Sequence, residues 1–86
     1  MSADRVARIR ALIEASLNPE HLDVIDESHM HIGHAGARDG RGHFRIRITC
    51  SGFAGKSRLA RHRMVYAALD EMMATDIHAL AIEEDS

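Results

Sequence analysis

A strand, a helix and a further strand follow one another in the second half of the chain, and this order restricts the folds that the chain can adopt. Residues 43–50 alternate between apolar and polar side chains, which is typical of a strand with one buried face. Residues 52–76 open with a glycine-bracketed turn and continue at helical spacing as one long helix, and the short run 77–82 is again strand-like. Because a helical crossover joins the two strands, we expect a sheet with a parallel component.

The first half of the chain adds one helix and one strand to this unit. Ser2 or Asp4 can cap a helix that extends to about Leu17 and ends before Pro19. Residues 21–27 alternate and predict a short strand. The order helix, strand, strand, turn, helix, strand corresponds to a two-layer α+β domain, in which helices cover one face of a three-stranded mixed sheet.

The apolar positions of these elements define the expected core. Cys50 shares the phase of the apolar residues in its strand, so it is predicted to be a core residue rather than a reactive thiol. Ser57 is suited to cap the long helix, and residues 83–86 are expected to fray. The residues predicted to face the core are Val6, Ile9, Ile13, Leu17, Phe44, Ile46, Ile48, Val65, Ala68, Leu69 and Met72.

Length and composition exclude several classes of protein. The 86 residues suffice for one domain, residues 1–86, and a single cysteine allows no intrachain disulfide. No apolar run reaches the roughly 18 residues that a membrane helix needs, so we expect a cytoplasmic protein that does not contact membranes. Nucleophile-elbow, P-loop, CxxC and HExxH patterns are absent from the sequence, and we therefore do not expect an enzyme.

Basic residues are concentrated in the middle of the chain, although the formal net charge is -2. Between residues 38 and 63 there are eight lysine or arginine residues and one acidic residue, Asp39. Basic side chains at the start of the long helix, with acidic ones toward its end, are the reverse of what the helix dipole favours. This arrangement either binds an anionic partner, such as nucleic acid or an acidic protein face, or is simply solvated. The basic residues of the turn and helix start are Lys56, Arg58, Arg61 and Arg63.

Histidine is the second unusual feature, with seven residues in the chain. Three lie in residues 28–42, a glycine- and histidine-rich segment without periodicity that we expect to be a mobile loop. His43 and His78 each stand at the start of a predicted strand, so a loop histidine could meet His78 if these strand ends are adjacent. Neutral imidazole suits zinc, iron or copper, and a partner's thiolate would have to complete an iron–sulfur site. Alternatively, each histidine is an ordinary surface residue. The loop histidines are His29, His31 and His34.

Several runs, taken together, resemble the BolA family over nearly the entire chain. The resemblance implies a class II KH-like α+β fold, in agreement with the element order above. Its most specific runs are Arg61-His62-Arg63-Met64-Val65-Tyr66 and Ile77-His78-Ala79-Leu80; the others are Asp26-Glu27-Ser28, His43-Phe44 and Phe53-Ala54-Gly55-Lys56-Ser57.

The resemblance also implies a role in iron–sulfur chemistry. BolA-like proteins partner monothiol glutaredoxins and share a [2Fe-2S] cluster, one ligand of which is the histidine that matches His78. A second ligand lies near the loop between the first two strands and is best matched by His31, with His34 and His43 as competitors. The glutaredoxin cysteine and a glutathione thiolate complete the set, so no cluster is expected in the isolated chain.

Other BolA-like proteins are transcriptional regulators of stress response and cell morphology. They bind double-stranded DNA through the turn and the basic helix start, which here would be Lys56, Arg58, Arg61 and Arg63. Our leading hypothesis is a non-enzymatic adaptor that binds a cluster with a glutaredoxin, and the alternative is a DNA-binding regulator. A third possibility is a structural adaptor whose basic strip docks on an acidic protein face.

Overall fold

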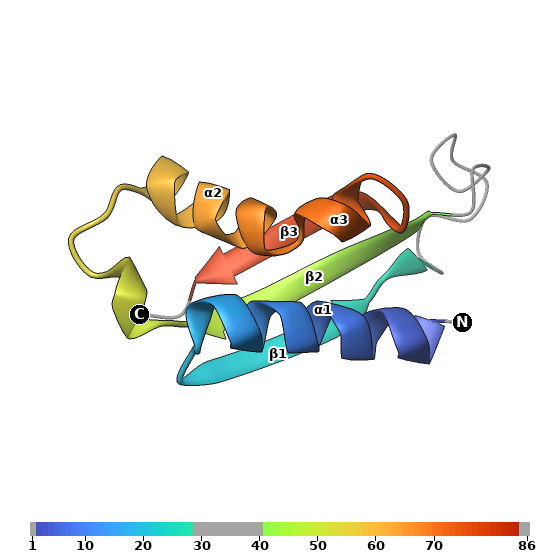
Figure 1. The fold of residues 1–86 in the computed structure, drawn as a ribbon, viewed down its shortest axis with the longest axis horizontal. Coiled ribbons are helices and arrows are strands. Elements are labelled where there is room, and N and C mark those ends of the chain that lie inside the picture. The colour runs from blue at the N-terminus through green and yellow to red at the C-terminus, as the bar shows by residue number, and fades with distance from the viewer. Residues whose placement is uncertain (1, 29–40, 85–86) are drawn as a thin grey trace.

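The computed structural model describes residues 2–28 and 41–84, which Figure 1 shows in colour. The predicted loop residues 29–40, with His29, His31 and His34, lie outside the described residues. The elements in chain order are α1 (Ser2–Leu17), β1 (His21–Asp26), β2 (Gly42–Thr49), the 3-10 turn η3 (Ser51–Phe53), α2 (Arg58–Ala68), α3 (Asp70–Met73) and β3 (Ile77–Glu84).

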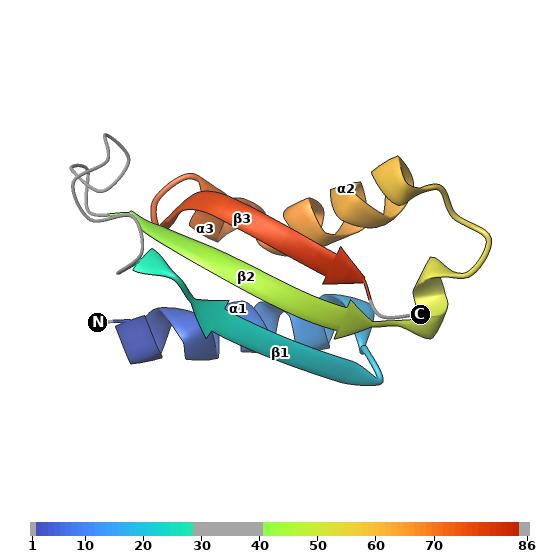
Figure 2. The ribbon, with the colours of Figure 1, turned by 180° about the vertical axis from the view of Figure 1, so that it is seen from behind.

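The strands form one mixed sheet with β2 in the centre. β1 pairs with β2 in the antiparallel sense, and β2 pairs with β3 in the parallel sense. The parallel pair follows from the helical crossover, as predicted. Helices α1, α2 and α3 lie on one face of the sheet, and no described element covers the other face (Figures 1 and 2). The predicted two-layer α+β architecture is therefore confirmed.

Local signals in the sequence set the ends of two helices. Asn18 adopts a left-handed conformation with φ of 48°, and its N–H donates to the carbonyl of Glu14 at 3.1 Å. A residue in this conformation ends α1, and Pro19 follows it. At the start of α2, the Ser57 hydroxyl accepts a hydrogen bond from the Ala60 N–H at 3.1 Å, which confirms the predicted N-cap.

The core lies between the sheet and the helices. Phe44, Ile46 and Ile48 of β2 are at most 2% exposed, as their alternation predicts. Cys50 continues the same phase and is 9% exposed, which confirms it as a core residue. Ala68 is only half-buried, and Val6 and Leu17 pack at the margin of the core. The helices contribute the buried side chains of Ile9, Ile13, Val65 and Met72, and Leu69, between α2 and α3, is also buried.

The prediction that residues 52–76 continue after their opening turn as one long helix is wrong, because the helix breaks at Leu69. Leu69 has φ of -104° and ψ of 13°, and it separates α2 from the short α3. Asp70 and Glu71 consequently lie in the first turn of α3 rather than at the end of α2. Acidic side chains are favourable at a helix start, so this half of the expected conflict with the helix dipole does not arise.

The prediction that residues 83–86 fray is wrong for the first two of them. β3 extends two residues beyond the predicted end at Ile82 and includes Glu83 and Glu84. Both glutamates form ion pairs with basic side chains, which hold the end of the strand in place. Within the described part of the chain, no helix is both long and apolar enough to cross a membrane.

Candidate metal site at the start of two parallel strands

His43 and His78 lie at the same end of the sheet because β2 and β3 run in parallel. Gly42 pairs with Ile77 and His43 pairs with Ala79, so His78 is an extra residue at an irregularity in the β3 ladder. Such bulges redirect a side chain and are frequent beside functional sites. The starts of the two strands that carry His43 and His78 are therefore adjacent, which is the condition that the sequence analysis set for a shared site.

The two imidazole rings are close to each other but differ in exposure. Their centroids are 5.2 Å apart and their planes are inclined by 50°. His78 is exposed, whereas His43 is half-buried and its Nε2 atom is removed from solvent. The His78 side chain is therefore the more accessible of the two.

Hydrogen bonds from the end of β1 fix the backbone of this site. The Ser28 hydroxyl accepts from the His43 N–H at 3.1 Å, and the Ser28 N–H donates to Asp26 Oδ1 at 2.8 Å. A Cβ atom on Gly42 would lie 2.7 Å from both Ser28 Oγ and the Phe44 ring, so only glycine fits without displacement of a neighbour. These contacts order the strand start from which His43 projects.

Arg41, which the sequence did not single out, directly contacts the candidate ligand. Its Nη2 atom lies 3.3 Å from Nδ1 of His78. Ser28 and Arg41 flank residues 29–40 in the chain, and each contacts one of the two strand starts at this site. Its position two residues before His43 places Arg41 near the site in sequence. Its contact with His78 on β3, however, depends on the pairing of the two strands.

The described residues supply two imidazoles to this site and no complete metal centre. No group of three or more His, Cys, Asp or Glu side chains among them could hold a metal ion. The site residues His31 and His34 lie outside the described part of the chain. Two neighbouring imidazoles, one of them exposed, fit a site that a partner's thiolates complete.

The predicted basic residues lie at the opposite end of the sheet, at the start of α2 (Figure 1). Arg61 forms an ion pair with Glu84 and donates to the Lys56 carbonyl at 2.5 Å. Arg61 thus joins α2 to β3 and is not a free surface charge. Lys56, Arg58 and Arg63 are exposed.

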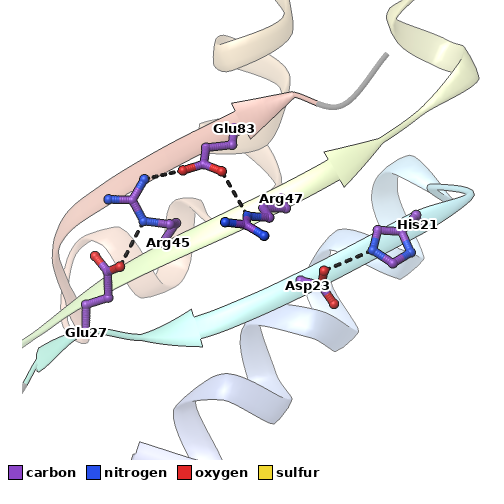
Figure 3. Close-up of polar contacts among 6 residues, drawn as sticks. All are labelled: His21, Asp23, Glu27, Arg45, Arg47 and Glu83. Carbon is purple, nitrogen blue, oxygen red and sulfur yellow. Dashed lines mark hydrogen bonds and ion pairs between the residues drawn. The ribbon is translucent and has the colours of Figure 1, made fainter.

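Much of the other positive charge is neutralised on the open face of the sheet, as Figure 3 shows. The Arg45 guanidinium pairs with Glu27 at 2.8 Å and also with Glu83, which pairs with Arg47 at 2.9 Å. Hydrogen bonds from Arg45 and Arg47 lower the pKa of the Glu83 carboxyl, and the hydrogen bonds that Arg45 donates to Glu27 and Glu83 raise the pKa of Arg45. This network balances two cations with two carboxylates. The local net charge around these arginines is therefore less positive than the count of basic residues along the chain suggests.

A groove of about 980 Å³ runs beside the start of α2 and carries both signs of charge. Arg58, Arg61 and His62 line it, together with the apolar Phe53. Its acidic lining residues are Glu20, Glu83 and Glu84. The groove is therefore not a uniformly cationic surface.

Comparison with known proteins gives concordant results. Residues 13–85 match the family model described as BolA-like protein. BolA-like protein 1 of Bos taurus is 47% identical, over 90% of this chain and 55% of its own length. The DNA-binding transcriptional regulator BolA of Escherichia coli (strain K12) is 39% identical, over 87% of this chain and 69% of its own length.

Solved structures agree with these matches. The BolA domain of SufE1 from Arabidopsis thaliana has a TM-score of 0.82 at 38% identity, covering 94% of this chain and 90% of that one. This likeness confirms the predicted class II KH-like fold. The chain spans about half the length of the bovine relative, at 55%.

Proposed function

Because the chain belongs to the BolA family, we propose that it is an adaptor that binds a [2Fe-2S] cluster in a complex with a monothiol glutaredoxin. Members of the family are non-enzymatic proteins, in line with the expectation from the sequence. Both the histidine ligands and the glutaredoxin partner are part of what we propose. A cytoplasmic location stays a prediction.

The observation that carries the proposal is the proximity of His43 and His78, whose ring centroids are 5.2 Å apart. His78 is exposed at a strand irregularity and is the proposed first ligand. The second is His31, with His34 and His43 as alternatives. His43 is disfavoured at one nitrogen, because its Nε2 atom is removed from solvent and the ring would have to turn to present it.

The chemistry of these donors suits the proposed group. Neutral imidazole is a ligand for iron, and histidine replaces cysteine on one iron in some [2Fe-2S] centres. The glutaredoxin cysteine and glutathione would supply the thiolates, since the only cysteine of this chain is the buried Cys50. This chain would orient the imidazoles through the strand starts of β2 and β3.

The test is to mix the protein with a monothiol glutaredoxin, glutathione, iron and sulfide, and to record visible absorption and circular dichroism. The proposal predicts a spectrum that differs from that of the glutaredoxin alone. His31→Ala, His34→Ala and His43→Ala then identify the second ligand. A spectrum unchanged by addition of this protein would refute the proposal.

A second candidate function is DNA binding, which the similarity to the DNA-binding transcriptional regulator BolA of Escherichia coli favours. The exposed Lys56, Arg58 and Arg63 would contact phosphates, whereas Arg61 is engaged by Glu84. Phosphate contacts make affinity fall steeply with salt. Arg58→Glu and Arg63→Glu should therefore abolish binding to a DNA duplex, and salt-independent affinity would exclude this function.

A further inference from the structure

The contact between Arg41 and His78 defines the hydrogen-bonding state of the candidate ligand. Arg41 Nη2 lies 3.3 Å from His78 Nδ1. A guanidinium group has only donors, so Nδ1 must accept this hydrogen bond and carry no hydrogen. In the neutral ring the proton is then on Nε2.

This arrangement affects metal binding at either nitrogen of His78. A metal at Nδ1 would need the lone pair that already accepts from Arg41. A metal at Nε2 would require the proton to move to Nδ1, where its N–H would face the guanidinium N–H. Arg41 must therefore withdraw from Nδ1 in both cases, and its positive charge stays within side-chain reach of the metal.

We propose that Arg41 is a specificity-determining residue for metal binding at His78. It disfavours a bare divalent cation and favours a cluster in which thiolates and sulfide already offset the positive charge of the iron. This inference rests on the proposed function. A bare cation is repelled by the guanidinium. A thiolate-ligated cluster is not repelled to the same extent, and it gains a negative charge when it takes up one electron, which the guanidinium stabilises.

The first test uses the isolated chain and Zn²⁺ as the probe, followed through the ¹⁵N resonances of the His78 ring. The unliganded protein should show an unprotonated Nδ1, and Arg41→Ala should bind Zn²⁺ about tenfold more tightly than the wild type. The gain should disappear in the Arg41→Ala, His78→Ala double variant. A protonated Nδ1 in the wild type, or equal Zn²⁺ affinity in Arg41→Ala, would overturn the proposal.

Arg47→Ala is the matched control for loss of one arginine. Arg47 lies on β2, whereas Arg41 directly precedes that strand, and the two are about 20 Å apart at the strand rise of about 3.3 Å per residue. It pairs with Glu83 and does not belong to the metal site. Zn²⁺ affinity of Arg47→Ala should match that of the wild type, and an equal gain in both variants would show a general charge effect and overturn the proposal.

The second test measures the reduction potential of the cluster in the complex with glutaredoxin. Arg41→Ala should shift the ratio of reduced to oxidised cluster about tenfold toward the oxidised form, which is about 59 mV for one electron. An unchanged potential would count against the proposal. If the wild-type mixture forms no shared cluster, the proposed function fails, while the Zn²⁺ titration still decides whether Arg41 disfavours a bare cation.

Discussion

Glu84, the last residue of β3, forms an ion pair with Arg61 near the start of α2. The same carboxylate also contacts the His62 ring, with its Oε2 atom 2.9 Å from His62 Nε2. Both side chains of the arginine pair are largely shielded, at 27% and 17% exposure. The pair therefore joins the end of the sheet to the helix that covers it, and it removes one cation from the proposed DNA-binding set.

Glu84→Gln should destabilise the protein by about 1–2 kcal/mol, because it leaves a partly buried arginine without its counter-charge. Urea denaturation measures the change. Glu14→Gln is the control, since Glu14 is 55% exposed and its pair with Arg10 at 3.7 Å is a surface contact. Equal stability of the two variants would show that the Glu84 pair contributes nothing beyond a surface contact.

Ser57→Ala should cost about 1 kcal/mol, because it removes the side-chain acceptor for the Ala60 N–H at the start of α2. The same denaturation experiment reports the loss, and amide exchange should quicken in the first turn of α2. Ser16→Ala, at an exposed position inside α1, is the control and should be neutral or slightly stabilising. A neutral Ser57→Ala would mean that the cap does not stabilise α2.

Stability should decrease in acid through Asp76 and Glu83. The pKa of Asp76 is lowered by the hydrogen bond from Thr75 and then by Arg5 and Arg8, which outweigh the effect of burial. A carboxylate with a lowered folded-state pKa stabilises the fold above its unfolded value, and this contribution is lost as pH falls through the folded value. The ordinary values are 3.8 for Asp76 and 4.5 for Glu83, so the loss should develop below these values.

Denaturation midpoints measured between neutral and acid pH test this expectation. Asp76→Asn should lower stability at neutral pH and flatten the decline in acid, because the variant has no carboxyl to protonate at this position. The same slope in Asp76→Asn and in the wild type would show that Asp76 is not responsible.

The sequence predicted the architecture well because the relevant signals are local. The alternation in residues 43–50 identifies the buried face of β2. Ser57 marks the start of α2 through a hydrogen bond to a residue only three positions later in the chain. The strand–helix–strand order implies parallel pairing, and that pairing brings the starts of β2 and β3 together. The adjacency of His43 and His78 therefore followed from the order of the elements.

Features that depend on distant partners could not be predicted in this way. Glu83 pairs with Arg45 and Arg47, which are 38 and 36 residues away in the chain, so β3 extends further than its apolar run suggests. The break between α2 and α3 occurs at the buried Leu69, without a proline or glycine that would mark it in the sequence. The contact of Arg41 with His78 depends on the register of β2 and β3.

Histidine ligation by His78 is the central claim, and pulsed electron paramagnetic resonance of the reduced cluster tests it most directly. This chain would be labelled with ¹⁵N-histidine and combined with unlabelled glutaredoxin and glutathione. We predict ¹⁵N hyperfine coupling in the wild type and loss of the coupling from one histidine in His78→Ala. The coupling should be unchanged in His21→Ala, because His21 is exposed at the other end of the sheet. Absence of ¹⁵N coupling in the wild type, or identical coupling in His78→Ala, would contradict the assignment.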